Sequence, residues 1–224
     1  MKSKDAVLAL LRETGIVPAV RTEDAASAIK SIEAIYRGGI RAVEIILAVP
    51  DAVHTIEQVV DALGGQLAIG AGTVLDAESA EACFAAGADF VAGPCLNTAT
   101  IEVAQRHSKA AFPGALTPTE VLAAWRAGAD AVKIYPCGLA GGPKYIRSLK
   151  APFPEIEMIA NGGVTLETVG DYLKAGAFAV GVGSGLIDAS HIREGRFVVF
   201  EERARRFVEA IAKTRHLINA AAIG

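Results

Sequence analysis

A glycine-led phrase that occurs four times constrains the fold of this chain more than any other feature of its sequence. Each copy opens on glycine and runs into mostly aliphatic residues, and the copies span residues 39–45, 87–93, 128–134 and 176–182. They recur roughly every 40–50 residues, a period typical of repeated supersecondary units. Glycine suits the end of a helix, and an aliphatic run suits a buried strand. We therefore expect each copy to join a helix to a strand.

Before and between the copies there is room for one more strand each, with helices in the intervals. The expected strands of this second set span residues 16–20, 67–70, 110–113 and 157–160. The expected helices span residues 23–36, 51–63, 76–86, 99–107, 118–127, 144–150, 166–175 and 197–213. Thr22, Asp76 and Thr117 are good N-cap residues for three of these helices.

Strict alternation of strands and helices predicts a parallel sheet, because strands joined through helices run in the same direction. Eight such units in 224 residues predict an α/β protein, a single (β/α)8 TIM barrel domain over residues 1–224. Residues 6–11 predict an extra amphipathic helix before the first strand. A doubly wound open sheet is the alternative. It usually has a glycine-rich loop after its first strand, where this chain has Val20-Arg-Thr-Glu23.

Composition and charge exclude several classes of function. A net charge of −3 without a basic cluster argues against nucleic acids and anionic membranes as partners. No apolar run approaches the roughly 20 residues that a membrane span requires. The three cysteines form no CxxC pair and are expected to be reduced thiols, which favours a cytoplasmic location. The four histidines lie far apart, so we expect no metal site.

The sixth residues of the four copies predict one layer inside the barrel. They are Glu44, Ala92, Lys133 and Gly181, on the second, fourth, sixth and eighth strands. In such barrels alternate strands contribute the four side chains of one interior layer. A layer that served packing alone would carry valine, isoleucine or leucine. An amine and a carboxylate with two small neighbours are typical of a reaction chamber instead.

Lys133 and Glu44 are therefore the candidate catalytic residues. Burial disfavours the charged form of a lysine, and a neutral amine can attack a ketone to form a Schiff base. Glu44 in the same layer is suited to carry the protons that this reaction moves. The alternative interpretation is a buried salt bridge without a chemical role, since apolar residues can often replace such a pair.

Two glycine-containing loops predict a phosphate site. Gly162-Gly163 follows the seventh expected strand, and Gly183-Ser184 follows the eighth. The loops after these two strands commonly form the phosphate site of such barrels. Glycines let backbone N–H groups approach the anion, and the Ser184 hydroxyl adds a donor. The alternative is that these glycines serve only tight turns.

Three further residues are expected at the same end of the barrel. Thr73 follows the third strand and is a candidate substrate contact, although an N-cap role for the next helix is an equal alternative. Pro94 closes the fourth strand and is expected to shape the wall of the site. Arg21 follows the first strand and could hold a carboxylate or a phosphate by its fork, unless it lies on the surface.

Six segments carry a resemblance to a known family: Val43–Leu47, Gly70–Leu75, Ala92–Pro94, Phe112–Gly114, Val132–Pro136 and Asn161–Gly163. Their order and spacing resemble those of the 2-keto-3-deoxy-6-phosphogluconate / 4-hydroxy-2-oxoglutarate aldolase family. The resemblance implies a class I aldolase without a metal or other cofactor, and a homotrimer of (β/α)8 barrels. It also implies cleavage of a phosphorylated keto acid to pyruvate and glyceraldehyde 3-phosphate.

The resemblance implies a role for each candidate residue. Lys133 corresponds to the Schiff-base lysine, Glu44 to the proton shuttle and Thr73 to a contact with the pyruvyl carboxylate. The two glycine loops, 162–163 and 183–184, correspond to the phosphate site.

The chain departs from the family pattern at three positions near the substrate. Ile46 and Ala48 replace a threonine and an arginine or threonine that many members carry, and Asn161 replaces the usual threonine before Gly-Gly. An arginine corresponding to Arg21 occurs in the branch that lacks the strand-2 arginine, so Arg21 is expected to take over anion binding. The reaction type is therefore predicted more firmly than the substrate.

The leading hypothesis is a lyase that releases pyruvate from a 2-keto-3-deoxy-6-phospho sugar acid of the gluconate or galactonate type, or from 4-hydroxy-2-oxoglutarate. One alternative is a phosphate-binding isomerase or epimerase that uses Lys133 and Glu44 as acid and base. The other is a non-catalytic barrel that binds sugar phosphates.

Overall fold

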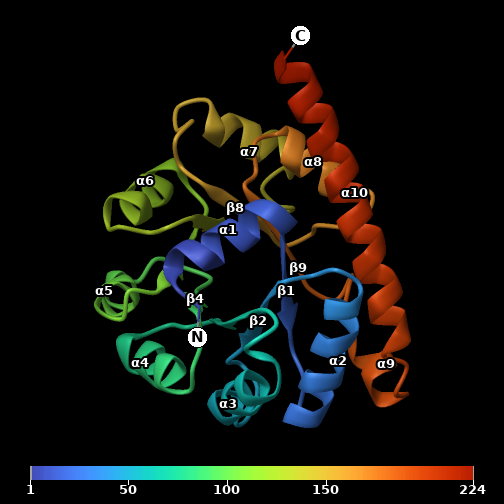
Figure 1. The fold of residues 1–224 in the computed structure, drawn as a ribbon. Helices are drawn as coiled ribbons and strands as arrows, with labels where there is room; N and C mark the ends of the chain where they lie inside the picture. The colour runs from blue at the N-terminus through green and yellow to red at the C-terminus, as the bar shows by residue number, and fades with distance from the viewer. Residues whose placement is uncertain (1, 224) are drawn as a thin grey trace.

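The computed structural model describes residues 2–223 and contains a ring of parallel strands surrounded by helices (Figure 1). The strands are β1 (Ile16–Val20), β2 (Ala42–Ile46), β3 (Ala68–Gly72), β4 (Phe90–Ala92), β5 (Ala110–Phe112), β6 (Gly114–Ala115), β7 (Val132–Ile134), β8 (Met158–Asn161) and β9 (Ala179–Val182). Their order is β5-β4-β3-β2-β1-β9-β8-β7-β6, and every neighbouring pair is parallel. The predicted TIM barrel is confirmed.

The fifth strand of the barrel is divided in two. The sequence predicts one strand over residues 110–113, whereas the structure has β5 before Pro113 and β6 after it. Proline has no N–H to donate to a ladder, so it interrupts the strand. Its carbonyl still accepts the Lys133 N–H at 2.9 Å. Because β5 pairs with β4 and β6 pairs with β7, the two short pieces together close the ring.

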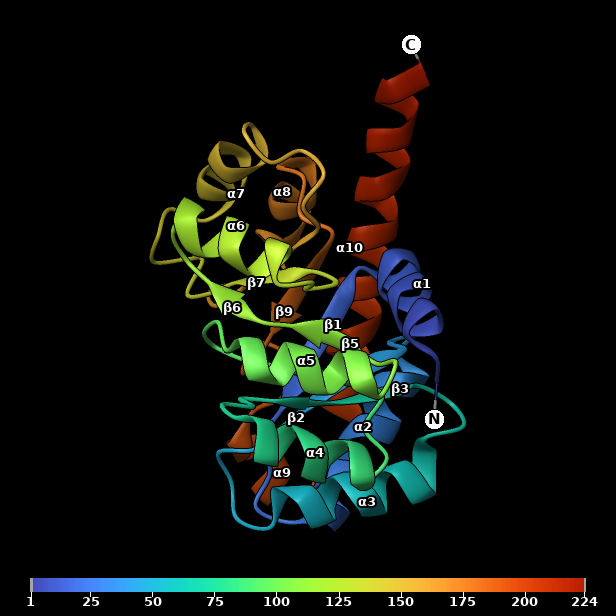
Figure 2. The same ribbon diagram turned by 90° about the vertical axis from the view of Figure 1, so that its left-hand side faces the viewer.

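Helices follow the strands around the outside of the barrel, and Figure 2 shows α3 to α6 in succession along one side. The helices are α1 (Lys4–Thr14), α2 (Ala25–Arg37), α3 (Ala52–Leu63), α4 (Ala77–Ala85), α5 (Thr98–Arg106), α6 (Pro118–Arg126), α7 (Pro143–Lys150), α8 (Val169–Lys174), α9 (Ala189–Arg193) and α10 (Val198–Ile223). The N-caps predicted at Asp76 and Thr117 are confirmed. The prediction for Thr22 is wrong, because Asp24 caps α2 through the Ser27 N–H.

The last helix continues ten residues beyond its predicted end at Lys213. Its buried side chains recur at helical spacing from Phe200 to Thr214 and pack against α2 and α8. The alanine-rich segment 219–223 has high helix propensity and contains neither glycine nor proline, so nothing ends the helix earlier. Figures 1 and 2 show its last turns projecting beyond the rest of the chain.

The predicted N-terminal helix is confirmed as α1, which closes one end of the barrel. Its Val7 and Leu11 are fully buried in a cluster with Ala42, Ala110 and Phe178. Farther inside, the rings of Phe90 and Phe112 lie 5.2 Å apart between their centroids. Bulky side chains therefore fill the half of the barrel next to α1.

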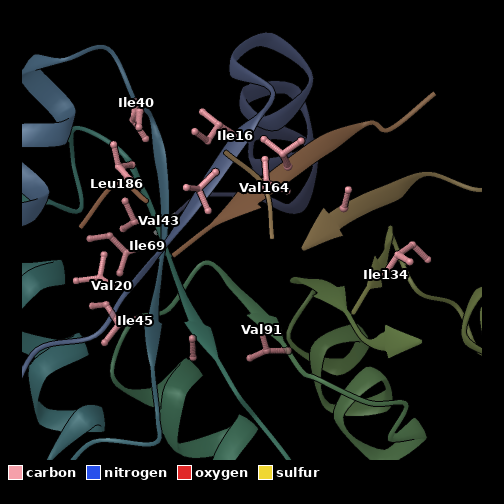
Figure 3. Packing of buried hydrophobic residues seen from close by; sticks show 14 of the residues in the cluster. Ile16, Val20, Ile40, Val43, Ile45, Ile69, Val91, Ile134, Val164 and Leu186 are labelled. Carbon is pink, nitrogen blue, oxygen red and sulfur yellow. The ribbon is translucent and has the colours of Figure 1, made fainter. Parts of the chain in front are cut away.

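A second and larger cluster lies between the strands and the helices. Strand residues that face outward contribute aliphatic side chains to it, among them Val43, Ile45, Ile69 and Val91 (Figure 3). Each of them is at most 2% exposed. The helices therefore cover the outer face of the barrel strands.

Candidate active site

A cavity of about 660 Å³ opens at the C-terminal ends of the strands. All nine residues that the sequence predicts for the site line it: Arg21, Glu44, Thr73, Pro94, Lys133, Gly162, Gly163, Gly183 and Ser184. They come from seven different strand ends, and only the barrel brings them together. This is the face at which TIM-barrel enzymes carry their active sites.

Lys133 and Glu44 meet inside the barrel. Lys133 Nζ donates to Glu44 Oε1 at 2.8 Å and to Oε2 at 3.1 Å. Lys133 is 7% exposed and Glu44 is 2% exposed, although both line the cavity. The two side chains therefore form a nearly dry ion pair at its base. The sequence-based expectation that they share the interior is confirmed.

Small residues lie in register with Lys133 and Glu44 on the neighbouring strands. Lys133 in β7 is in register with Gly114 in β6, and Glu44 in β2 is in register with Ala19 and Gly70. A Cβ at Gly114 would lie 2.1 Å from the Pro94 carbonyl carbon, and one at Gly70 would lie 2.2 Å from the Phe90 ring, so neither place accepts a side chain. The close packing of β6 and β3 against their neighbours therefore requires glycine beside the catalytic candidates.

One more glycine makes room for the carboxylate. A Cβ at Gly72 would lie 2.6 Å from Ile46 Cδ1 and 3.1 Å from Glu44 Cδ. The other members of the predicted layer also lie inside: Ala92 is buried in the inner cluster, and Gly181 lines the cavity. The position of Glu44 therefore depends also on Gly72, which the repeated phrase does not connect to it.

Thr73 has an unusual backbone conformation where it lines the cavity. Its φ is +62°, in the left-handed region that a β-branched residue rarely adopts. Asp76 caps α4 by accepting the Ser79 N–H at 2.7 Å, so Thr73 is not the N-cap. Strained conformations of this kind cluster at functional sites, where the surrounding structure holds them.

The two predicted glycine loops present unpaired backbone donors. Gly162 and Gly163 have φ values of +90° and +86°, which L side chains rarely adopt. After β9, the Gly183 carbonyl accepts the N–H groups of Leu186 and Ile187 at 3.0 and 3.2 Å, so residues 183–187 form one helical turn. Within residues 2–223, no partner accepts the N–H groups of residues 162, 163, 184 and 185. Free N–H groups at the start of a turn favour an anion.

Comparison with known proteins shows a consistent set of relatives. Residues 7–201 match the model of the KDPG and KHG aldolase family. The 2-dehydro-3-deoxy-6-phosphogalactonate aldolase of Escherichia coli K12 is 36% identical over 210 residues, covering 93% of this chain and 96% of that one. The 2-dehydro-3-deoxy-phosphogluconate aldolase of Pseudomonas aeruginosa PAO1 is 29% identical over 206 residues, covering 92% and 93%. The solved "Native KDPGal structure" has a TM-score of 0.83 at 33% identity and covers 90% of this chain and 96% of that chain.

The chain belongs to the KDPG and KHG aldolase family. It is accordingly a lyase, a class I aldolase that cleaves its substrate to pyruvate and an aldehyde. The family resemblance that its sequence motifs indicate is confirmed. Membership favours the aldolase over the isomerase and over the non-catalytic binding protein.

The positions at which this aldolase departs from the family pattern all line the cavity. Ile46 and Ala48 add apolar surface to the β2 side, and Asn161 lies at the end of β8. A Cβ at Gly181 would lie 2.0 Å from Asn161 Nδ2, so the side-chain amide of Asn161 packs directly over that glycine. Arg21 makes no ion pair or side-chain hydrogen bond with another described residue, so its guanidinium is free to bind an anion.

Sequence reasoning missed Tyr135 and Thr165, which also line the aldolase cavity. Tyr135 lies two positions after Lys133, and in an extended strand the side chains of residues i and i+2 point to the same face. That period could have identified the tyrosine. Thr165 lies in the loop after β8, where no periodicity operates. Its backbone N–H donates to the Thr168 hydroxyl at 3.0 Å.

The thiol nearest in sequence to Lys133 is not a second nucleophile for the site. Cys137, two residues after Tyr135, is buried, and burial raises its pKa to about 11. Its thiol is therefore neutral at physiological pH.

Within residues 2–223 no three histidine, cysteine or carboxylate side chains gather in a group that could hold a metal ion. No helix in the same range is long and apolar enough to cross a membrane.

Proposed function

We propose that this aldolase cleaves a 2-keto-3-deoxy-6-phospho sugar acid, with Lys133 as the Schiff-base residue. The products are pyruvate and glyceraldehyde 3-phosphate. One observation carries the proposal: the buried 2.8 Å contact between Lys133 Nζ and Glu44 Oε1 lies at the base of a cavity whose rim has free backbone donors. The pair supplies a nucleophile with its proton acceptor, and the rim supplies an anion site.

The chemistry follows from the pair. Lys133 transfers a proton to Glu44, and its neutral Nζ attacks the C2 ketone to form a carbinolamine. Glu44 returns the proton to the hydroxyl of that adduct, which leaves as water, and an iminium remains. Glu44 next accepts the proton of the C4 hydroxyl. The C3–C4 bond breaks, the aldehyde leaves, and the bond's electron pair forms an enamine. Protonation at C3 and hydrolysis of the new iminium then release pyruvate and the free lysine.

The two charged ends of the substrate have separate partners in this proposal. The carboxylate next to the ketone binds near Lys133, through the Thr73 hydroxyl and the free guanidinium of Arg21. The phosphate binds the N–H groups of the 162–163 and 184–185 segments. Ser184 adds its hydroxyl there. Pro94 forms part of the wall and donates no hydrogen bond.

Relatives support the galactonate configuration as the preferred one at C4. The relative that is 36% identical is named for phosphogalactonate, and the one that is 29% identical is named for phosphogluconate. The replacement of a family threonine by Asn161 changes the hydrogen-bonding groups of the wall. We place the C4 hydroxyl on this side of the cavity.

The same proposal covers partners and location. We infer a homotrimer, as the family resemblance implies, and a cytoplasmic protein, as three unpaired cysteines suggest. Sedimentation equilibrium of the purified protein tests the trimer, and a monomer at micromolar concentration would contradict it.

Pyruvate release from the two C4 epimers of the phosphorylated acid, and from 4-hydroxy-2-oxoglutarate, tests the proposal. We expect the galactonate epimer to have the highest kcat/KM. Borohydride added with pyruvate should reduce the iminium and leave a stable mass increment on Lys133. Lys133→Arg is the matched control: a guanidinium stays protonated and forms no imine, so cleavage and trapping should both disappear.

Glu44→Gln separates the two roles. It should slow turnover by about 10²–10⁴-fold, because a positioned acid and base is lost, while slow trapping on Lys133 continues. Turnover of the Lys133→Arg variant at the wild-type rate, or a mass increment on another lysine, would refute the Schiff-base assignment.

A further inference from the structure

One arginine of α10, Arg203, donates a hydrogen bond to the backbone of the loop after β9. Arg203 Nη1 donates to the Leu186 carbonyl at 3.2 Å and to Asp188 Oδ2 at 2.7 Å. Leu186 belongs to the turn of residues 183–187, whose other end faces the cavity. Arg203 itself does not line that cavity. The arginine therefore contacts the anion-binding turn on the side away from the substrate.

Asp188 fixes the guanidinium in place. Its carboxylate caps α9 by accepting the N–H groups of Ser190 and His191 at 3.1 Å each. It also accepts from the Ser190 hydroxyl at 2.5 Å and lies 2.8 Å from His191 Nδ1. Burial alone would raise the pKa of Asp188, but these hydrogen bonds and the one from Arg203 outweigh it and hold the pKa below its usual range. The partner of Arg203 is thus a charged and ordered carboxylate.

The packing of α9 on α10 adds to this arrangement. The rings of His191 and Phe200 lie 6.1 Å apart between their centroids, edge to face. Figure 1 shows α9 beside the first turns of α10. Arg203 lies on the same early part of α10. It contacts the loop after β9 through Leu186 and the N-cap of α9 through Asp188.

The buried side chains of Leu186 and Ile187 anchor the end of the turn in the outer core, and Arg203 adds a hydrogen bond to its backbone. Within residues 2–223, Arg203 is the only residue whose side chain donates a hydrogen bond to the backbone of residues 183–187. No acceptor among the described residues bonds the N–H groups of residues 184 and 185. A cradle of free donors binds an anion well only when its geometry is set in advance, because ordering a loop on binding costs free energy.

We propose that Arg203 is a positioning residue: it holds the 183–187 turn so that its free N–H groups converge on the substrate phosphate. The inference rests on the proposed function of this loop as the phosphate site. Arg203 acts through the Leu186 carbonyl and Asp188 and does not touch the substrate. Its loss should weaken the phosphate contacts and leave the chemistry at Lys133 intact.

A direct electrostatic role makes a different prediction. Arg203 and Arg206 both line a smaller cavity of about 240 Å³, which shares Thr165 and Gly185 with the active-site cavity. If the two guanidinium groups attracted the anion from there by charge, Arg206→Met and Arg203→Met would have equal effects. Positioning requires Arg203 alone, because no hydrogen bond joins Arg206 to the turn within the described residues.

The experiment compares four variants of the full chain: Arg203→Met, Arg203→Lys, Arg206→Met and Arg205→Met. Arg205 is the matched control, since it lies on α10, is exposed and pairs with Glu201 at 3.0 Å. For Arg203→Met we expect the KM for the phosphorylated substrate and the Kd for inorganic phosphate to rise about tenfold, as for one lost charge-assisted hydrogen bond.

Two measurements on Arg203→Met should match the wild type. One is the KM for an unphosphorylated substrate, for which 4-hydroxy-2-oxoglutarate serves, and the other is borohydride trapping of pyruvate. Neither depends on a phosphate contact. Arg203→Lys should recover part of the loss in phosphate affinity, because an ammonium can still bind Asp188.

Two results would overturn the proposal. One is a phosphate Kd in Arg203→Met equal to that of the wild type. The other is an equal loss in Arg206→Met. Calorimetric titration with inorganic phosphate requires no turnover, so it tests the positioning role even if the wild type fails the trapping experiment. Should Arg203→Met not fold, the same titration on Arg203→Lys decides, with a weaker phosphate affinity than in Arg205→Met expected.

Discussion

Removing one charge of the Lys133–Glu44 pair should destabilise the protein more than removing both. Lys133→Met leaves the Glu44 carboxylate, 2% exposed, without its cation and without the bonds of 2.8 and 3.1 Å. Breaking a buried pair in this way costs about 3–5 kcal/mol of stability. At about 2–4 °C per kcal/mol for a chain of this size, Tm should fall by roughly 6–20 °C.

Removing both charges together should not cause this loss of stability. Lys133→Met with Glu44→Met replaces both charges by apolar side chains of similar volume, a change that is often neutral or stabilising. We therefore expect the double variant to unfold at a higher urea concentration than either single variant, and within about 1 kcal/mol of the wild type or above it. Urea unfolding at pH 7, followed by circular dichroism without ligand, measures all three.

An exposed pair supplies the control. Lys174 and Asp171 lie 3.6 Å apart with side chains 52% and 63% exposed, so Lys174→Met should change stability by less than about 1 kcal/mol. If Lys133→Met proved as stable as the wild type, or the double variant less stable than both singles, the pair would not be desolvated in the way described.

Three further outcomes are expected. Thr73→Gly should relieve the left-handed backbone and raise stability by at most about 1 kcal/mol, yet weaken pyruvate binding, whereas Thr73→Ser keeps the hydroxyl and should bind pyruvate normally in calorimetry. The Ser31 hydroxyl is buried and bonds no residue in the part of the chain that the structure describes, so Ser31→Ala should gain about 1 kcal/mol in urea unfolding, and a loss would show a missed partner. Burial raises the pKa of Cys83 to about 12 and of Cys137 to about 11, so at pH 8 at most about one part in a thousand of each is thiolate. Only the exposed Cys95 should therefore react with a thiol reagent before unfolding, and labelling of more than one thiol in the native protein would contradict this.

Much of this aldolase could be predicted from its sequence because the decisive patterns are periodic. The glycine-led phrase recurs in step with the strand–helix unit, so it predicts the alternation and the barrel. Glu44 and Lys133 are both the sixth residue of their copies. Because alternate strands of a barrel contribute to one interior layer, residues at the same position of the copies are expected in the same layer. The glycine loops are recognisable for the same reason, since they follow strands whose order is already known.

What the sequence could not supply depends on contacts between distant segments. Lys133 approaches Glu44 to 2.8 Å beside Gly72, where a Cβ would crowd the carboxylate, and no local propensity reports which strands are neighbours. The same holds for three other features. The strand break at Pro113 and the left-handed backbone of Thr73 arise only when the ring closes, and Arg203 bonds the β9 loop only when α10 packs on the barrel. Period and propensity are properties of adjacent residues, and they determined the barrel and its candidate residues. Distances across the barrel follow from side-chain volumes and backbone strain in the assembled protein, which only the tertiary structure decided.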